Sequence, residues 1–166
     1  DKAVKMCKSL TDLSTIKKCD TLGKKGKDVL KVLGLKERAD YVIGNPPYAP
    51  MEKDIVIDTD DYNFLRSVKD AGSNLFIAAI YRAFEITKDE GYISYIIPKN
   101  FLHVRSYSVL RREILNSKRI VSIIDIGAYF SGVRGEQIIL TLQNSHKPDN
   151  EIRIMKLDDH KFVDCC

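Results

Sequence analysis

The most regular feature of this chain is a series of short apolar runs, each bounded by polar or turn-forming residues. The runs are rich in Val, Ile, Leu and Tyr, which is typical of strands buried inside a sheet. The sequence predicts strands at 39–44, 92–98, 119–127 and 136–143, a fifth at 151–157, and a short one within 14–22. Because 39–44 has apolar residues on both faces, we expect it to be a buried strand of a parallel sheet.

Other segments have the periodicity of amphipathic helices. We expect helices at 2–13, 74–90 and 107–117, and a short helix or an irregular connection at 28–35. The segment 74–90 is the clearest of these, and Gly91 is expected to end it. Residues 49–70 are polar and irregular, and they predict a long loop.

The order of these elements predicts the fold class. Strands and helices alternate up to residue 127, which favours an α/β fold with a mostly parallel sheet. Residues 128–135 are too few for a helical crossover, so the strands on either side of them should pair antiparallel. The sheet should therefore end in an antiparallel hairpin strand.

Composition narrows the class of protein without identifying it. The chain has 166 residues, 44% hydrophobic and 30% charged, which is ordinary for one globular domain. Its net charge of +4 is compatible with a polyanionic partner. Cys7, Cys19, Cys165 and Cys166 form no CxxC pair, so the sequence predicts no metal site and a reduced, cytoplasmic protein. No apolar stretch reaches the ~20 residues of a membrane helix.

The motif Asn45-Pro46-Pro47-Tyr48 follows the predicted strand 39–44 directly. Proline fixes its own φ and drives the preceding residue into an extended conformation, so this segment is rigid. The prolines lack N–H groups, which leaves carbonyl acceptors and the Asn45 side-chain oxygen, and Tyr48 adds a ring for stacking. Ligands of such sheets bind at the carboxyl ends of strands, where this motif lies. Taken alone, the four residues could equally form a stiff turn without function.

These acceptors suit chemistry at an amino group attached to an aromatic ring, whose lone pair is delocalised. If Asn45 Oδ1 and the Pro46 carbonyl each accept one amino hydrogen, the nitrogen can pyramidalise and direct its lone pair at a methyl donor. The fixed oxygens then stabilise the positive charge that develops on nitrogen. A base inside a DNA duplex would have to flip out to reach such a site.

Taken in order, the motifs resemble those of amino-group methyltransferases that use S-adenosylmethionine and carry an (N/D)PP(Y/F) motif. Within that group the chain is similar to DNA adenine-N6 methyltransferases of bacterial restriction–modification systems, of the gamma arrangement. The likeness is carried by "CDTL" at 19–22, "DYVIGNPPY" at 40–48, the helix and strand of 74–102, and the helix, strand and hairpin of 110–142. It implies a partial Rossmann-like class I methyltransferase fold.

The resemblance also implies roles for single residues. The amine would be polarised by Asn45 and Pro46, the shape held by Pro47, the base sandwiched by Tyr48 and Phe130, and the cofactor contacted by Asp20, Thr21 and Asn45. Each has a simpler alternative: Asp20 as a turn residue, Phe130 as core. Asn74 and Phe76 are expected to cap and to pack, while Lys99 and Asn100 either contact phosphate or belong to an ordinary loop.

The family binds its cofactor with a glycine-rich loop after its first strand, and no such loop is found here. The resemblance therefore predicts that residues 1–150 are the carboxyl half of a catalytic domain without its first two strands. Residues 151–166 would begin a following segment or end the sheet. The implied partners are double-stranded DNA with a flipped adenine and a restriction nuclease domain or subunit.

Other functions fit the same motif. Related enzymes with this motif methylate a glutamine side chain of translation release factors, or guanine in ribosomal RNA, and their amines pose the same chemical problem. A DNA-binding module without activity is a further alternative, which would bind DNA in a salt-dependent manner whether or not the cofactor is present.

Overall fold

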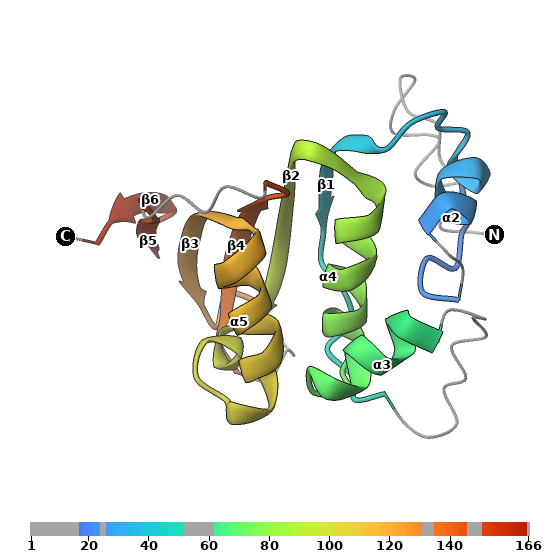
Figure 1. Cartoon of the computed structure of the whole chain (residues 1–166). Coiled ribbons are helices and arrows are strands. Elements are labelled where there is room, and N and C mark those ends of the chain that lie inside the picture. Colours follow the sequence, from blue (N-terminus) through green and yellow to red (C-terminus); the bar gives the residue numbers. More distant parts are fainter. Residues whose placement is uncertain (1–16, 24–25, 52–61, 131–134, 146–150, 166) are drawn as a thin grey trace.

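A computed structural model describes residues 17–23, 26–51, 62–130, 135–145 and 151–165 (Figure 1). The described strands form one six-stranded sheet in the order β1-β2-β4-β3-β5-β6. They are β1 (Ala39–Gly44), β2 (Thr87–Pro98), β3 (Arg119–Gly127), β4 (Gln137–Gln143), β5 (Arg153–Asp158) and β6 (Lys161–Asp164). The described helices are α2 (Gly26–Leu33), α3 (Tyr62–Asp70), α4 (Leu75–Ile86), α5 (Ser108–Ser117) and the short 3-10 helices η1 (Lys99–Leu102) and η2 (Arg105–Tyr107).

Strand direction in this sheet confirms the predicted α/β class. The pairs β1–β2 and β3–β5 are parallel, and β4 is antiparallel to both of its neighbours, β2 and β3. Four strands therefore run the same way, and the predicted antiparallel pairing on either side of 128–135 is confirmed. Because β4 is antiparallel to both β2 and β3, these two strands run in the same direction as β1. The carboxyl ends of β1, β2 and β3 therefore lie at the same end of the sheet.

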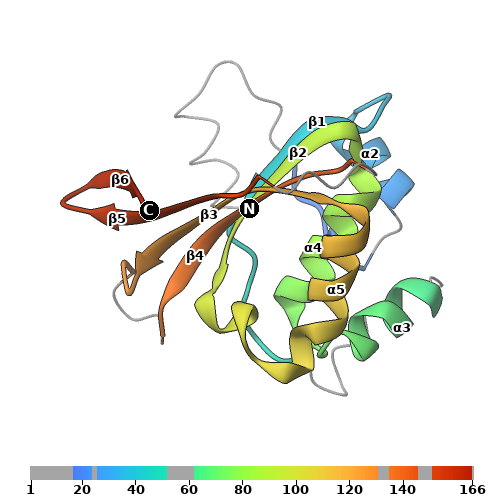
Figure 2. The ribbon, with the colours of Figure 1, turned by 60° about the vertical axis from the view of Figure 1, so that its left-hand side comes forward.

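Helices cover one face of the sheet. Figure 2 shows α4 and α5 lying over that face, and α2 and α3 pack against α4. Among the described elements, no helix lies on the opposite face (Figure 2). None of the described helices is long and apolar enough to cross a membrane.

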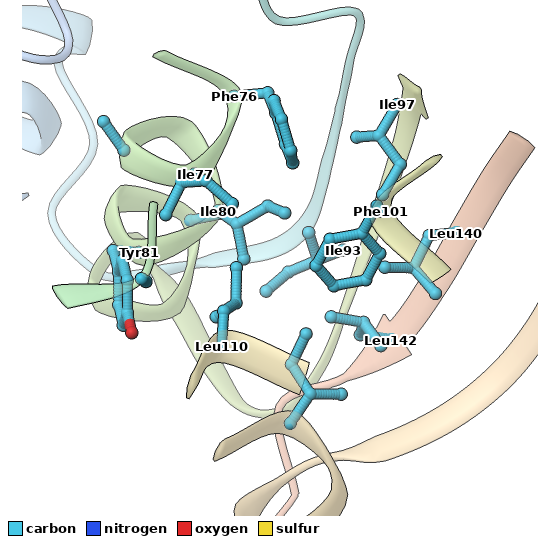
Figure 3. Close-up of a cluster of buried hydrophobic side chains, with 14 of the residues drawn as sticks. Phe76, Ile77, Ile80, Tyr81, Ile93, Ile97, Phe101, Leu110, Leu140 and Leu142 are labelled. Carbon is cyan, nitrogen blue, oxygen red and sulfur yellow. The ribbon is translucent and has the colours of Figure 1, made fainter. Parts of the chain in front are cut away.

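The main core fills the space between α4, α5 and the sheet (Figure 3). Its labelled side chains are Phe76, Ile77, Ile80 and Tyr81 of α4, Ile93 and Ile97 of β2, Phe101 of η1, Leu110 of α5, and Leu140 and Leu142 of β4. Full burial of each Phe, Ile or Leu stabilises the fold by roughly 1.5–3 kcal/mol. These residues therefore fix the position of α4 over β2, and with it the segments attached to the two ends of α4.

The carboxyl end of α4 differs from the prediction. The helix ends at Ile86, and Thr87 is both its C-cap and the first residue of β2. Gly91, expected to end the helix, lies inside β2, where a Cβ would stand 2.9 Å from the Asp40 carbonyl oxygen and 2.8 Å from Thr87 Cγ2. The glycine is needed because two backbone segments approach closely, and not because a helix ends there.

The expectation that 39–44 is a buried strand is wrong for the described chain. β1 is the first strand in the sheet order, and Tyr41 and Ile43 are 68% and 79% exposed. The face that carries Val42 packs against the main core, whereas the other face is open. The apolar pattern on both faces is real, but only one face has a partner among the described residues.

The remaining elements also depart from the prediction in part. Residues 17–23 contain no strand, and residues 62–70 of the predicted loop form α3, although 52–61 lie outside the described residues. The helix expected at 2–13 lies outside them too. The strand β6 was not predicted, and it forms a hairpin with β5 through Asp159 and His160, both at positive φ. β5 pairs with β3, so residues 153–158 continue the sheet.

Candidate active site

The motif Asn45-Pro46-Pro47-Tyr48 leaves the carboxyl end of β1 in an irregular conformation, outside any helix or strand. Pro46 is buried, whereas Asn45 and Pro47 are exposed. The motif therefore presents the amide of Asn45 at the surface, next to a proline that is buried in the protein.

Tyr48 folds back on its own motif. Its hydroxyl lies 2.6 Å from Asn45 Oδ1 and 3.1 Å from the carbonyl oxygen of Ile96 on β2, both of them acceptors. Burial raises the pKa of the Tyr48 phenol above its ordinary value, so the hydroxyl keeps the proton that it donates. The ring is half-buried and packs against the main core.

The amino end of α4 holds the chain that follows the motif. The Asn74 side chain accepts from the Phe76 N–H at 3.2 Å, and its Nδ2 lies 3.4 Å from the Tyr48 carbonyl oxygen. The Leu75 N–H donates to the Ala49 carbonyl at 3.0 Å. Capping by Asn74 and packing by fully buried Phe76 are confirmed. The contact from Asn74 to Tyr48 was not predicted, because the two residues are distant in sequence.

The segment with Asp20 and Thr21 is a tight loop. Asp20 Oδ1 accepts from the N–H groups of Leu22 and Gly23, at 3.1 and 3.0 Å, which is the turn geometry given above as the simpler alternative. The Thr21 carbonyl accepts from Arg82 Nε of α4 at 3.0 Å. Sequence reasoning missed Arg82, which is buried although it carries a charge.

Phe130 lies at the end of the described chain that follows β3. It packs against a second, smaller core with Ile126, Ile96 and Leu157, and its ring contacts Tyr129 with centroids 5.4 Å apart. A pocket of about 280 Å³ opens beside these side chains. Among the described residues the Phe130 and Tyr48 rings do not touch. Ile96 lies near both residues: its carbonyl oxygen accepts from the Tyr48 hydroxyl, and its side chain packs against the same second core as Phe130.

Lys99, at the carboxyl end of β2, forms ion pairs with two carboxylates. Its Nζ lies 2.8 Å from Asp125 Oδ2 and 2.7 Å from Glu136 Oε2, and these contacts raise the pKa of the Lys99 ammonium. The structure therefore favours a link between strand ends over the phosphate contact considered for this lysine. Asn100 accepts the backbone N–H groups of His103 and Val104 through its own carbonyl, as a turn residue does.

The described part of the chain contains no candidate metal site. No group of three or more His, Cys, Asp and Glu side chains is placed there to hold a metal ion. Cys19 and Cys165 are free thiols.

Comparison with known proteins identifies the family. The model of the Eco57I restriction-modification methylase family matches residues 3–130. A Methanocaldococcus jannaschii protein named as a type II restriction enzyme and methyltransferase is 32% identical over 111 residues, which is 64% of this chain and 9% of that protein. The adenine-specific methyltransferase BrxX of Escherichia coli O9:H4 (strain HS) is 28% identical over 116 residues, 68% of this chain and 10% of that protein.

A solved structure supports the fold. A Listeria monocytogenes protein named as a class I S-adenosylmethionine-dependent methyltransferase superposes with a TM-score of 0.59 at 21% identity, covering 76% of this chain and 39% of that chain. The sheet described above is thus part of a Rossmann-like class I methyltransferase fold. The chain spans about a tenth of the length of the two curated relatives described above. Because the family model covers most of its length, the chain belongs to the Eco57I restriction-modification methylase family.

Proposed function

We propose that this chain forms part of a DNA methyltransferase of a restriction–modification system and holds a flipped adenine at the carboxyl end of β1. The observation that carries the proposal is the position of Asn45, which is exposed at that strand end with its Oδ1 oriented by the Tyr48 hydroxyl. Membership of the Eco57I restriction-modification methylase family supports the same reading.

The chemistry follows from the acceptors at this strand end. An amide oxygen has two lone pairs, and Tyr48 occupies one on Asn45 Oδ1, so the second can accept an amino hydrogen of adenine. The Pro46 carbonyl is proposed to accept the other hydrogen, which frees the nitrogen lone pair for attack. Pro47 keeps the segment extended, and the developing positive charge is stabilised by oxygens that need not reorganise.

The base is proposed to stack between Tyr48 and Phe130. Such a sandwich needs the two rings to lie apart, and the ring contact described for Phe130 is with Tyr129. Because Tyr48 is half-buried and hydrogen-bonded, its ring offers a fixed surface for stacking.

The loop at Asp20 fits the adenine end of S-adenosylmethionine. Asp20 Oδ1 is held by two backbone N–H groups, and Gly23 lacks the Cβ that would stand 2.6 Å from Oδ2, so that oxygen has room for a ligand's amino group. S-adenosylmethionine supplies the electrophilic methyl group when bound. We propose that Asp20 and Thr21 bind its adenine and that Asn45 lies at the end that reacts.

Replacing Asn45 tests the proposal. The full-length protein would receive methyl-labelled S-adenosylmethionine with unmethylated DNA, a release-factor protein and ribosomal RNA in one reaction. We expect label in DNA as N6-methyladenine, and no transfer by Asn45→Ala with DNA affinity retained. Asn63→Ala, the same change on the exposed surface of α3, is the matched control and should transfer normally.

Each other outcome replaces part of the proposal. Label in the release factor or in ribosomal RNA would keep the role of Asn45 and change the substrate. Salt-dependent DNA binding without any transfer by a folded protein would favour a binding module. Activity of Asn45→Ala close to that of the unaltered protein would refute the assignment of the site.

A further inference from the structure

Arg82 of α4 is the largest fully buried side chain in the described structure, with 2% of its surface exposed. Burying a charge costs free energy that only good partners offset. Among the described residues, Arg82 Nη2 has no hydrogen-bond partner, so this arrangement is not the one that stability alone would favour. A buried ion pair can often be replaced by apolar side chains without loss of stability. The charged, forked side chain therefore calls for another explanation.

Arg82 contacts two segments outside its own helix and one residue within it. Its Nε donates to the Thr21 carbonyl at 3.0 Å, and its guanidinium carbon lies 4.1 Å from the centre of the Phe64 ring of α3. Its Nη1 pairs with the Glu85 carboxylate one turn along α4. The planar guanidinium can make these contacts together because its donors are fixed in one plane.

Glu85 extends the same link to the start of α2. Its Oε2 accepts from the Gly26 N–H at 3.1 Å, at the helix end where a negative charge is favourable. A Cβ at Gly26 would stand 2.7 Å from Glu85 Oε2, so only glycine permits this approach. The Arg82–Glu85 pair thus holds both the loop of residues 20–23 and the helix that follows it.

Among the described residues, the loop of residues 20–23 has few other attachments. Leu22 packs against the main core, and the bonds of Asp20 Oδ1 are internal to the loop. The bond from Arg82 is therefore the polar contact that ties the loop backbone to α4 in the described structure. The opposite end of α4 is attached to the last residue of the motif, because Asn74 Nδ2 lies 3.4 Å from the Tyr48 carbonyl oxygen.

We propose that Arg82, supported by Glu85, is a positioning residue that fixes the Asp20–Thr21 loop for the adenine of the methyl donor. This rests on the proposed function, in which that loop binds the cofactor. Because one rigid helix carries both attachments, α4 also sets the distance between the loop and the motif of residues 45–48.

Two substitutions on α4 test this in the full-length protein. Arg82→Lys keeps the charge but loses the fork, and Glu85→Gln keeps the size but loses the ion pair. Tyr81→Phe is the matched control: it removes a hydrogen bond of 2.7 Å to Glu113 on α5 and leaves the loop untouched. The measurements are the Kd for S-adenosylmethionine by calorimetry, the Kd for DNA, and hydrogen exchange of the Leu22 and Gly23 amides without donor.

For Arg82→Lys we expect a Kd for the donor raised about tenfold, the size of one lost charge-assisted hydrogen bond. Exchange at Leu22 and Gly23 should be faster, and DNA affinity should be unchanged. Glu85→Gln should shift the same two readouts less, and Tyr81→Phe neither. A purely structural role would instead weaken donor and DNA binding together.

The outcomes separate this inference from the proposed function. Unchanged donor affinity in Arg82→Lys, or equal losses in Tyr81→Phe, would overturn the inference while DNA methylation by the unaltered protein still stood. Expected shifts in a protein that methylates another acceptor would uphold Arg82 and replace the substrate. A folded, unaltered protein that binds no S-adenosylmethionine would overturn both.

Discussion

At the scale of the residue, the hydroxyl of Tyr48 lies 2.6 Å from Asn45 Oδ1, and the proposed function makes this contact responsible for orienting Asn45. We expect Tyr48→Phe to lower kcat for methyl transfer by about threefold to tenfold, because one neutral hydrogen bond is lost while the stacking ring remains. The KM for the donor should not change. Steady-state kinetics of the full-length protein would show this, with Tyr129→Phe, an exposed tyrosine, as the control. A normal kcat for Tyr48→Phe would mean that Asn45 is oriented by other groups.

A second prediction at this scale concerns Asp125 and Lys99. Burial raises the pKa of Asp125, but its hydrogen bonds with Lys99 and with the Gly127 N–H outweigh this, so the net pKa lies below its ordinary value of 3.8. A depressed carboxyl pKa adds stability at neutral pH, and this stability is lost as the pH falls through the folded-state pKa. Because both side chains are more than a third exposed, we expect Asp125→Asn to cost under about 1 kcal/mol at pH 7.

The pH dependence distinguishes this pair from simple packing. The difference in unfolding free energy between Asp125→Asn and the unaltered protein should shrink as the pH falls below 3.8. Urea unfolding at several pH values would measure it. A difference that is constant with pH would show that the ion pair with Lys99 does not contribute.

At the scale of the element, the crowded contact between β1 and β2 depends on Gly91. We expect Gly91→Ala to lower the free energy of unfolding by roughly 1–3 kcal/mol, because its Cβ would meet the carbonyl oxygens of Asp40 and Lys88 at 2.9 and 3.0 Å. Gly44→Ala on β1 is the matched control, since its nearest neighbour is a Tyr95 ring carbon at 3.1 Å, which can move. Thermal unfolding would compare them, and equal costs would refute the steric argument.

The elements also show what sequence can predict. The strands 39–44 and 119–127 have the predicted bounds, since each is an apolar run that ends at a glycine. The end of α4 was missed because residues 87–90 have no apolar pattern of their own. Pairing across the sheet, with Thr87 beside Ala39, draws them into β2. A tertiary contact thus overrides the local preference.

In the candidate site, too, contacts between residues close in sequence could be predicted and contacts between distant residues could not. The contact between Asn45 and Tyr48 joins residues three apart, so a local motif could predict that they act together. The bond from Arg82 to Thr21 spans 61 residues and ends on a backbone carbonyl. No side-chain pattern marks such an acceptor, and an arginine within a helix usually indicates an exposed face. Only the three-dimensional structure, in which α4 packs beside the loop, reveals this hydrogen bond.

At the scale of the whole molecule, helices cover one face of the sheet, and among the described elements no helix covers the other, which is called the open face here. On the open face, Tyr41 stacks on Tyr92 with ring centroids 5.8 Å apart, and Ile43 is 79% exposed beside them. Among the described residues, β1 pairs with β2 alone, so its outer edge can accept another strand. An apolar patch next to an open edge promotes association between chains.

This arrangement predicts the behaviour of the 166-residue chain produced alone. We expect it to self-associate as its concentration rises, and we expect Ile43→Lys to reduce association, because a charge on an edge strand opposes pairing. The unfolding temperature should not fall, because the Ile43 side chain is mostly exposed and contributes little to the core. Sedimentation velocity over a range of concentrations would measure association. Val109→Lys, on the exposed side of α5, is the control. If that change reduced association equally, or if the unaltered chain stayed monomeric, the open face of β1 would not be the surface through which chains meet.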